Sequence, residues 1–390
     1  MVVTYIMYLI FLFYLIVKGK KALHMLQQNL YNENNRYLKW ISNNIATAFL
    51  NLDIVSCLFI IIGCLLKNDI LIILSIAIYV VDMVRIKKIR AKEQVKKPLV
   101  ITARVKRLLV TISILYLIPL VVTLLNNNLN YSMLMVSSIM VYLEYLVVLL
   151  AKVINKPVER CVYLKYYHQA QKKLKSMSNL SVIGITGSYG KTSSKNILSD
   201  ILNVKYIARP TPRNLNTEYG LMITINNHLD KFDDILIAEM GAYRPGEIKT
   251  LCDMVHPKYG ILTRVGTAHL ETFKTRENIQ KTKFELIESL PSDGVAILNK
   301  DDEWQTSYHL KNNVEVVWIG ITNQDADVVA YNIKCSNKGS TFDIKFKDDD
   351  NYYWLLKPYN QSYYKTYVDF DNSNIDIVFF AIRENEDLYS

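Results

Sequence analysis

The sequence has little of what builds disulfide frameworks and zinc sites. Its 390 residues include five cysteines and six histidines. The cysteines are scattered, without a C-x-x-C pair, and two of them lie in one apolar run. We therefore expect neither disulfides nor zinc, and we expect reduced, buried thiols. The five are Cys57, Cys64, Cys161, Cys252 and Cys335.

Acidic residues are fewer than basic ones: the chain has 36 Asp and Glu and 46 Lys and Arg, so its formal net charge is +10. The basic residues cluster beside apolar runs, as they do between Lys152 and Lys175. Such clusters indicate anionic membrane lipid as the partner, and no nucleic acid is expected.

Long hydrophobic runs are abundant, and hydrophobic residues make up 51% of the chain. This fraction is too high for an ordinary soluble protein, and the excess lies before residue 155. We interpret five apolar runs as transmembrane helices. They are Val2–Val17, Thr47–Leu66, Ile70–Val84, Leu108–Leu125 and Met133–Val153.

Charge predicts the orientation of these spans. Arg85–Arg107 carries ten Lys and Arg against the single Glu93, and Lys18–Trp40 carries five, whereas Asn126–Ser132 carries no charge. Basic loops stay in the cytoplasm. We therefore expect a plasma-membrane protein with its N-terminus outside and everything after Lys152 in the cytoplasm.

Two features of the apolar region have alternative interpretations. The first run resembles a signal peptide in length, but no small-residue cleavage site follows it, and three lysines come directly after Val17. Glu144 lies inside the fifth run, where a carboxylate is a functional candidate, a transport role included. A polar partner within the bundle or a place near the span boundary would also explain this residue.

Glycines mark a loop in the middle of the chain, Gly184–Ser193, between an apolar strand and an amphipathic helix. Its backbone N–H groups, the helix dipole, the cation of Lys191 and the hydroxyl of Thr192 together form a cradle for phosphate and Mg²⁺. Ile185 stands where the strict P-loop spacing has glycine. The loop therefore predicts a nucleoside triphosphate, and the alternative is a glycine-rich turn in an α/β domain that binds no nucleotide.

From Ser181 onward, apolar runs alternate with helical stretches, which predicts an α/β domain with a mainly parallel sheet. The expected strands are Val182–Thr186, Ile235–Glu239, Tyr259–Val265, Val295–Asn299 and Val314–Ile319, and the expected helices are Ser194–Leu202, Gly246–Met254, Glu277–Leu290 and Asp302–Leu310. Beyond Lys334 we expect one hairpin strand at Gly339–Ile344 and then an irregular segment, Asn351–Ser390, with one strand-like stretch at Ile375–Ile382.

The expected fold is thus a multi-pass α-helical membrane region followed by an α/β domain with a P-loop. We divide the chain into a transmembrane region of about five helices (1–153), a basic juxtamembrane linker (154–180), a central ATP-binding domain (181–334) and an incomplete or irregular C-terminal segment (335–390).

Several blocks between Ser181 and Asp302 resemble the Mur ligase family, which forms amide bonds with ATP in peptidoglycan assembly. The blocks are Thr186–Thr192, Asn214–Gly220, Ile237–Ala242, Arg244–Ile248, Leu262–Glu271, Lys281–Glu285 and Leu298–Asp302. Residues 237–248 resemble the signature of the member that adds D-alanyl-D-alanine, whereas Thr217 departs from the asparagine usual in the peptidoglycan members. The family's uridine-nucleotide domain is replaced here by spans, and its C-terminal domain looks absent or cut short.

The resemblance implies a role for each of several residues. Lys191, His269 and Lys283 would be catalytic, Lys283 as a carbamylated lysine. Thr192 and Glu239 would hold Mg²⁺, and His269 would help to bind a second metal. The nucleotide would contact Gly187, Ser188, Gly190, Lys191, Thr192, Ser193 and Asn299.

Four of these residues also have a structural alternative. Glu239 would be a solvent-facing strand end, and His269 a structural histidine. Lys283 would be a charge on an exposed helix face. Asn299 would belong to a turn that ends in the helix cap Asp302.

The function that follows is a membrane-anchored, ATP- and Mg²⁺-dependent ligase that activates a carboxylate, in a peptidoglycan precursor or another substrate, as an acyl phosphate. A partner that supplies the missing C-terminal domain fits this hypothesis. The alternative is a truncated or non-catalytic ATP-binding scaffold. An ATP-driven transporter would carry transport-ATPase signature segments, which are not found.

Overall fold

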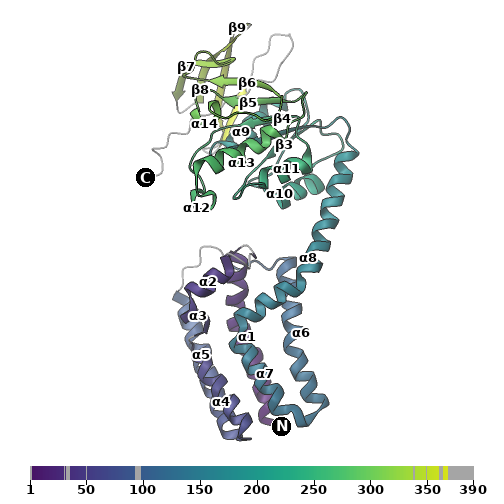
Figure 1. Cartoon of the computed structure of the whole chain (residues 1–390), viewed down its shortest axis with the longest axis vertical. Coiled ribbons are helices and arrows are strands. Elements are labelled where there is room, and N and C mark those ends of the chain that lie inside the picture. Colours follow the sequence, from purple (N-terminus) through teal and green to yellow (C-terminus); the bar gives the residue numbers. More distant parts are fainter. Residues whose placement is uncertain are drawn as a thin grey trace. The chain divides into compact units, whose positions relative to one another are not determined.

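The computed structural model describes residues 2–29, 31, 36–49, 51–92, 98–336, 339–347, 349–359 and 363–367. The chain divides into two compact units, Met1–Tyr163 and Leu164–Ser390. The first unit is helical and the second contains a sheet with helices on its faces (Figure 1).

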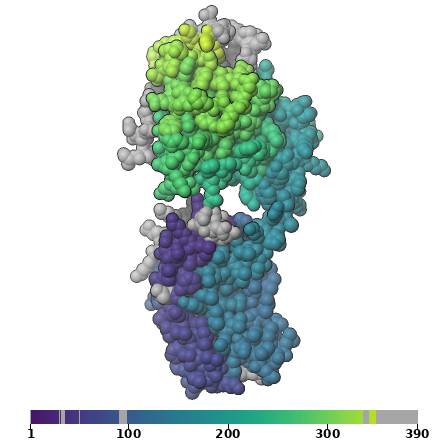
Figure 2. All heavy atoms as spheres, in the orientation of Figure 1, coloured from purple at the N-terminus to yellow at the C-terminus, as the bar shows by residue number. Residues whose placement is uncertain are grey.

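The first unit consists of helices that run beside one another. Their bounds are α1 Val2–Gln28, α2 Leu38–Asn43, α3 Ile45–Phe49, α4 Asp53–Leu65, α5 Asp69–Lys92, α6 Ala103–Leu125, the short η2 Asn127–Leu129, α7 Asn130–Tyr142 and α8 Glu144–Lys175, which continues into the second unit. Helix α1 contacts α5 and α7, and α4 contacts α5 and α7. In the space-filling view the purple N-terminal segment accordingly lies against segments from later in this unit (Figure 2).

The outward surface of this unit is strongly apolar. Two buried clusters form its interior, one around Tyr37 and Tyr145 and the other around Tyr14 and Tyr79. Large apolar side chains nevertheless remain exposed along α1, α4, α5, α6 and α8, with Leu125 82% exposed. Soluble monomers rarely expose apolar surface over so many elements.

Two helices of the described residues, α1 and α6, are long and apolar enough to cross a membrane by length and composition. A third span results if α7 and α8 count as one, although they meet at an angle of 91°. Two of the five expected spans are therefore not continuous helices: the second is divided into α3 and α4, and the fifth into α7 and α8.

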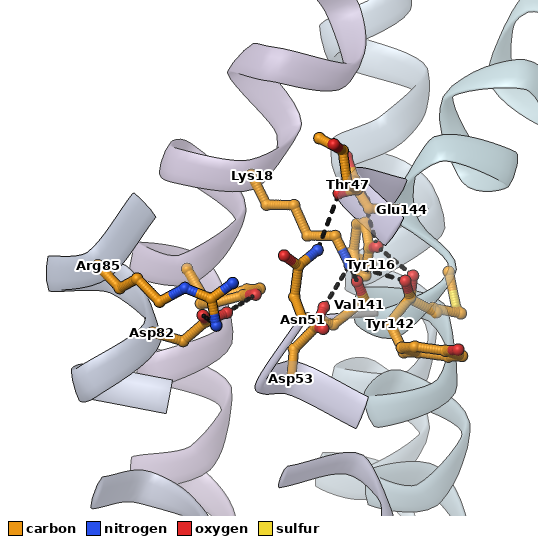
Figure 3. A network of polar contacts seen from close by, with 12 residues as sticks. Lys18, Thr47, Asn51, Asp53, Asp82, Arg85, Tyr116, Val141, Tyr142 and Glu144 are labelled. Carbon is orange, nitrogen blue, oxygen red and sulfur yellow. Dashed lines mark hydrogen bonds and ion pairs between the residues drawn. The ribbon is translucent and has the colours of Figure 1, made fainter. Parts of the chain in front are cut away.

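Buried polar groups meet where the fifth run breaks. The amine of Lys18 on α1 pairs with Asp53 at the start of α4 and donates to the carbonyls of Val141 (3.2 Å) and Tyr142 (2.7 Å) at the end of α7 (Figure 3). The last carbonyls of a helix lack intrahelical partners. Lys18 supplies two of them with a donor, and this explains why the chain can bend here.

Glu144 begins the next helix at the same break. Its carboxylate accepts a hydrogen bond of 2.5 Å from the Tyr116 hydroxyl and is 1% exposed (Figure 3). A Cβ on Gly19 would lie 2.8 Å from Glu144 Oε1, so the glycine makes room for the carboxylate. Of the alternatives for Glu144, the structure thus provides a polar partner within the bundle.

The second unit is built on a ten-stranded sheet, in the order β10-β9-β8-β7-β6-β5-β4-β1-β3-β2. Strands β1 to β7 pair in parallel, and β8 to β10 are antiparallel. The strands are β1 Ser181–Thr186, β2 Ala208–Pro210, β3 Ile235–Glu239, β4 Tyr259–Leu262, β5 Val295–Asn299, β6 Glu315–Gly320, β7 Val328–Ser336, β8 Gly339–Phe346, β9 Asp349–Tyr359 and β10 Tyr363–Tyr367. The helices are α9 Lys191–Leu202, α10 Glu218–Ile223, the short η3 Thr224–His228, α11 Glu247–Val255, α12 Leu270–Phe273, α13 Arg276–Glu288 and α14 Glu303–Thr306.

Alternation along β1 separates the two faces of this sheet. Ile183 and Ile185 pack in one cluster with Ile197 and Leu198 of α9. Gly184 points the other way, where an added Cβ would lie 2.6 Å from Leu286 of α13. Successive strand residues face opposite sides, so α9 and α13 cover opposite faces.

All five expected strands and the first three expected helices are confirmed within a few residues at their ends. Strands β2 and β7 were not expected, and Asp302–Leu310 yields only the one-turn α14. The segment expected to be irregular contains β9 and β10, whose runs of Tyr, Trp and Leu favour strands. The expected strand Ile375–Ile382 lies outside the described residues.

Of the four cysteines described as free, Cys57, Cys64 and Cys252 are buried, as expected. Cys161, on α8, is exposed, which corrects that expectation.

Candidate nucleotide-binding site

The glycine loop leaves the carboxyl end of β1 and enters α9 in a conformation that only glycine accommodates easily. Gly187 has φ +152° and Gly190 has φ +79°. A Cβ on Gly187 would lie 1.9 Å from Thr263 Oγ1. The Thr263 hydroxyl in turn lies 2.6 Å from the carbonyl of Tyr189 and 3.2 Å from that of Thr186. The loop is therefore fixed against the end of β4.

The loop presents positive charge and backbone donors. Gly190 is the N-cap of α9 and provides no side-chain cap, so the first N–H groups of this helix stay available to an anion. The amine of Lys191 lies over the loop, 2.7 Å from the carbonyl of Gly187 and 3.4 Å from that of Ser188. Ser188 Oγ accepts from Gly266 N–H at 2.9 Å, and Ser193 lies in the first turn of the helix.

A buried carboxylate stands beside this helix. Glu239 ends β3, next to Ile185 of β1, and is 1% exposed. Its Oε2 accepts from Thr192 Oγ1 (3.1 Å) and from Lys195 Nζ (2.9 Å), and its Oε1 accepts from Asn216 Nδ2 (3.0 Å). Glu239 is thus not a solvent-facing strand end, and the structural alternative for it is wrong.

The pair of Thr192 and Glu239 is suited to Mg²⁺. Hydroxyl and carboxylate oxygens are ligands that Mg²⁺ accepts, and this ion usually takes one or two carboxylates together with waters and substrate phosphates. The described residues contain no cluster of three or more metal-ligating His, Cys, Asp or Glu. The site therefore fits a cation held partly by its nucleotide.

His269 and Lys283 form a second group near the loop. The His269 ring lies 4.6 Å from that of Tyr243. Burial, together with the positive charges of Lys283 and Lys191, lowers the pKa of His269. The neutral imidazole that results has a lone pair for a metal ion.

Lys283 is 4% exposed, so the alternative of an exposed helix face is wrong for this residue. Burial, with the charge of Lys191 as a second cause, lowers the pKa of its amine to about 7. Glu285 and Glu247 act in the opposite direction. A buried amine that is substantially neutral at pH 7 is a nucleophile, which is the property that carbamylation needs.

Asn299 lies at the end of β5, two strands away from β1. Its Oδ1 accepts from Asp301 N–H at 2.9 Å, and its own N–H donates to Gln305 Oε1 at 2.8 Å. Asp302 caps α14 and accepts from Val265 N–H at 2.7 Å. The structure thus places Asn299 in the turn that was its alternative, and an adenine contact stays a prediction.

The sequence analysis missed two members of the carboxylate cluster, Lys195 and Asn216. Lys195 is 1% exposed and also donates to the Arg213 carbonyl at 2.6 Å. Lys195 follows Thr192 by three residues, so both side chains lie on one face of α9. This spacing is the feature of the sequence from which Lys195 could have been predicted as a neighbour of Thr192. Asn216 fits because Gly241 has no side chain: a Cβ there would lie 2.9 Å from the Asn216 side chain.

Residues 185–354 match the Mur ligase middle domain model. This part of the chain is a Mur ligase middle domain. Over 123 residues the chain is 43% identical to the UDP-N-acetylmuramoyl-tripeptide--D-alanyl-D-alanine ligase of Mycobacterium leprae, an alignment that covers 32% of this chain and 24% of the relative. The enzyme of the same name from Escherichia coli is 30% identical over 165 residues, 42% of this chain and 36% of the relative.

Solved structures similar to this chain carry related names. The MurF ligase of Thermotoga maritima in complex with ADP matches with a TM-score of 0.46 and 33% identity, covering 50% of this chain and 45% of that one. MurF from Acinetobacter baumannii matches with a TM-score of 0.46 and 26% identity, covering 50% and 42%. The chain spans only about a quarter to two fifths of the length of the curated relatives that it matches. The family match, residues 185–354, lies within the second unit.

Proposed function

We propose that this protein is a membrane-anchored ligase that uses Mg²⁺ and ATP to join a carboxylate of a peptidoglycan precursor to an amine. The observation that carries the proposal is the junction of β1 and β3, where the glycine loop, Lys191, Thr192 and Glu239 meet at the carboxyl ends of two neighbouring parallel strands. Ligands of open α/β sheets bind at such edges. The similar ligases of Mycobacterium leprae and Escherichia coli support the reaction class.

The reaction proceeds through two bond exchanges. A substrate carboxylate oxygen attacks the γ-phosphorus of ATP, an O–P bond forms, and the bond to the β,γ-bridging oxygen breaks to release ADP. The amine then attacks the acyl carbon, a C–N bond forms, phosphate leaves, and the amine proton passes to solvent. Two anions must approach each other in the first exchange, so the protein has to screen charge.

The chain's own residues supply that screening. The N-terminus of α9 and the amine of Lys191 bind the transferring phosphate. Thr192 and Glu239 would hold Mg²⁺, which screens the phosphate oxygens, and Lys195 and Asn216 keep Glu239 in place. Lys283, as a carbamate, and neutral His269 would hold a second cation on the substrate side.

We further propose that the helices before residue 164 lie in the plasma membrane, with the N-terminus outside and the second unit in the cytoplasm. The supporting observations are the apolar, exposed side chains of α1 and α6 and the basic residues in the C-terminal halves of α1 and α5. A lipid-linked precursor suits such an anchor.

An isotope-exchange experiment tests the ligase reaction without an amine. ATP labelled with oxygen-18 in the β,γ bridge is incubated with the full-length protein, Mg²⁺ and either a nucleotide-linked or a lipid-linked muropeptide. Acyl phosphate formation scrambles the bridge label into the non-bridging β positions, and Lys191→Ala should abolish this scrambling. If ATP binds but no muropeptide induces scrambling or ADP release, the protein is the non-catalytic binder instead.

A further inference from the structure

The first unit contains a basic pocket that the ligase reaction does not use. It has a volume of about 220 Å³ and lies between α6 and α8. Its lining consists of Tyr31, Arg104, Leu108, Lys152, Asn155, Lys156 and Glu159. All these residues belong to one compact unit, so the pocket does not depend on the placement of the second unit.

Helical spacing brings the charges of the pocket together. Lys152, Lys156 and Glu159 are separated by four and three residues on α8 and therefore share one face. Like charges four residues apart on a helix repel each other, so bringing the two lysines together has an electrostatic cost. An anion between them would remove that cost.

The carboxylate of the pocket, Glu159, forms ion pairs with two arginines. Glu159 pairs with Arg104 (3.1 Å) and with Arg107 (2.7 Å). Arg104 also lies over the Tyr31 ring, 4.5 Å from its centroid. These contacts hold the Arg104 guanidinium at one wall of the pocket and leave the lining with more positive than negative charge.

The two helices of the pocket also expose apolar side chains. Leu108 forms part of the wall, and Val153, Ile154 and Leu109 on the same two helices are 50%, 47% and 39% exposed. The volume is below the roughly 300–1,000 Å³ of pockets that hold drug-sized ligands. A compact anionic group thus fits this volume.

We propose that this pocket binds a terminal phosphate or pyrophosphate group. Such a group carries two or more negative charges and accepts hydrogen bonds from several directions, which matches two ammonium groups and one guanidinium around a small cavity. The group comes either from a lipid headgroup or from a soluble phosphate compound. This proposal goes beyond the ligase reaction and does not depend on it.

The experiment uses the full-length protein in phosphatidylcholine nanodiscs doped with phosphatidic acid, a phosphate monoester, or with phosphatidylglycerol, a phosphodiester. Native mass spectrometry counts the lipids retained on the protein, and calorimetry with inorganic pyrophosphate tests the soluble source. We expect wild type to retain one phosphatidic acid in preference to phosphatidylglycerol. Lys152→Gln/Lys156→Gln should weaken this binding about tenfold or more, because two charge-assisted contacts are lost.

The matched control is Lys106→Gln/Arg160→Gln, which removes the same charge from exposed positions on the same two helices outside the pocket. It should bind as wild type does. Lys156→Gln alone, at an exposed side chain, keeps the test valid if the double variant misfolds, and circular dichroism checks folding. If the protein binds pyrophosphate but not phosphatidic acid, and the two lysines are again required, the ligand of the pocket is a soluble phosphate compound and not a lipid headgroup. Equal losses in the two double variants, or no binding of either probe by wild type, would overturn the proposal.

Discussion

At the scale of single residues, the candidate site depends on side chains whose surroundings change their ordinary chemistry. Lys283 shows this most directly, because burial takes its amine out of water and the pKa falls to about 7. A buried ammonium has lost its hydration and is disfavoured against the neutral amine. The same burial that makes the residue look structural makes it reactive.

Lys283 should therefore react with an amine-directed reagent at a pH where other lysines do not. The neutral fraction rises as the pH rises through about 7, so the rate should be half-maximal there and fall about tenfold for each pH unit below it. Peptide mapping after brief cyanate treatment measures this rate, with exposed Lys281 on the same helix as the reference. A Lys283 rate that keeps rising beyond pH 9, parallel to that of Lys281, would contradict the lowered pKa.

Two glycines with positive φ differ in what surrounds them, and they form a matched pair. Gly246→Ala should cost about 1–2 kcal/mol of unfolding free energy from backbone strain, since nothing lies within 4 Å of its added Cβ. Gly187→Ala should cost about 1–3 kcal/mol more, because that Cβ meets Thr263. Denaturant unfolding gives both values, and equal costs would mean that the loop is not packed against Thr263.

At the scale of elements, the break between α7 and α8 joins the helices of the first unit through Lys18. Its amine pairs with Asp53 of α4 and donates to the carbonyls at the end of α7, so three helices share one buried cation. Removal of one partner of a buried pair leaves the other charge uncompensated.

Lys18→Met should therefore destabilise the first unit by about 3–5 kcal/mol, whereas Lys18→Met/Asp53→Leu should recover part of this loss because it removes both charges. Asp53→Leu completes the cycle, and unfolding of the detergent-solubilised full chain, followed by circular dichroism, gives the loss of unfolding free energy for all three variants. If the double variant loses as much as the two single variants together, or more, the pair does not act as described.

Elements of the second unit were predicted from sequence because their signals are local. Apolar runs of five to seven residues bounded by turns located β1, β3, β4, β5 and β6. The glycine loop indicated the helix that follows it, which was expected from Ser194 and begins at Lys191. Strand β2 has only three residues, too short for any periodic pattern. The partners of Glu239 come from α9 and from the loop before α10, so only the folded sheet brings Lys195 and Asn216 together.

The helices of the first unit were less predictable for the opposite reason. Apolar composition identifies the runs, but it contains no signal for the bend at Leu143, which depends on a lysine 125 residues earlier in the chain. Glu144 alone indicated a polar feature at that place, and its partner Tyr116 lies on another helix.

At the scale of the whole molecule, the proposed membrane anchor precedes a nucleotide site on the cytoplasmic side, and exposed Cys161 reports on this orientation. After Cys335→Ser, a membrane-impermeant maleimide should label Cys161 in inside-out vesicles and not in intact cells, because Cys57, Cys64 and Cys252 are buried. Cys161→Ser provides the background. Labelling in intact cells would place the second unit outside, away from ATP.

The most direct test of the central claim is the equilibrium binding of ATP to the full-length protein in nanodiscs, with and without Mg²⁺. We predict saturable binding by wild type that Mg²⁺ strengthens. Lys191→Ala should weaken it about 100-fold, because a contact between charged groups is lost in a site shielded from water, while exposed Lys205→Ala should have no effect. Absence of ATP binding by the folded wild-type protein in the presence of Mg²⁺, or equal affinities for wild type and Lys191→Ala, would contradict the account.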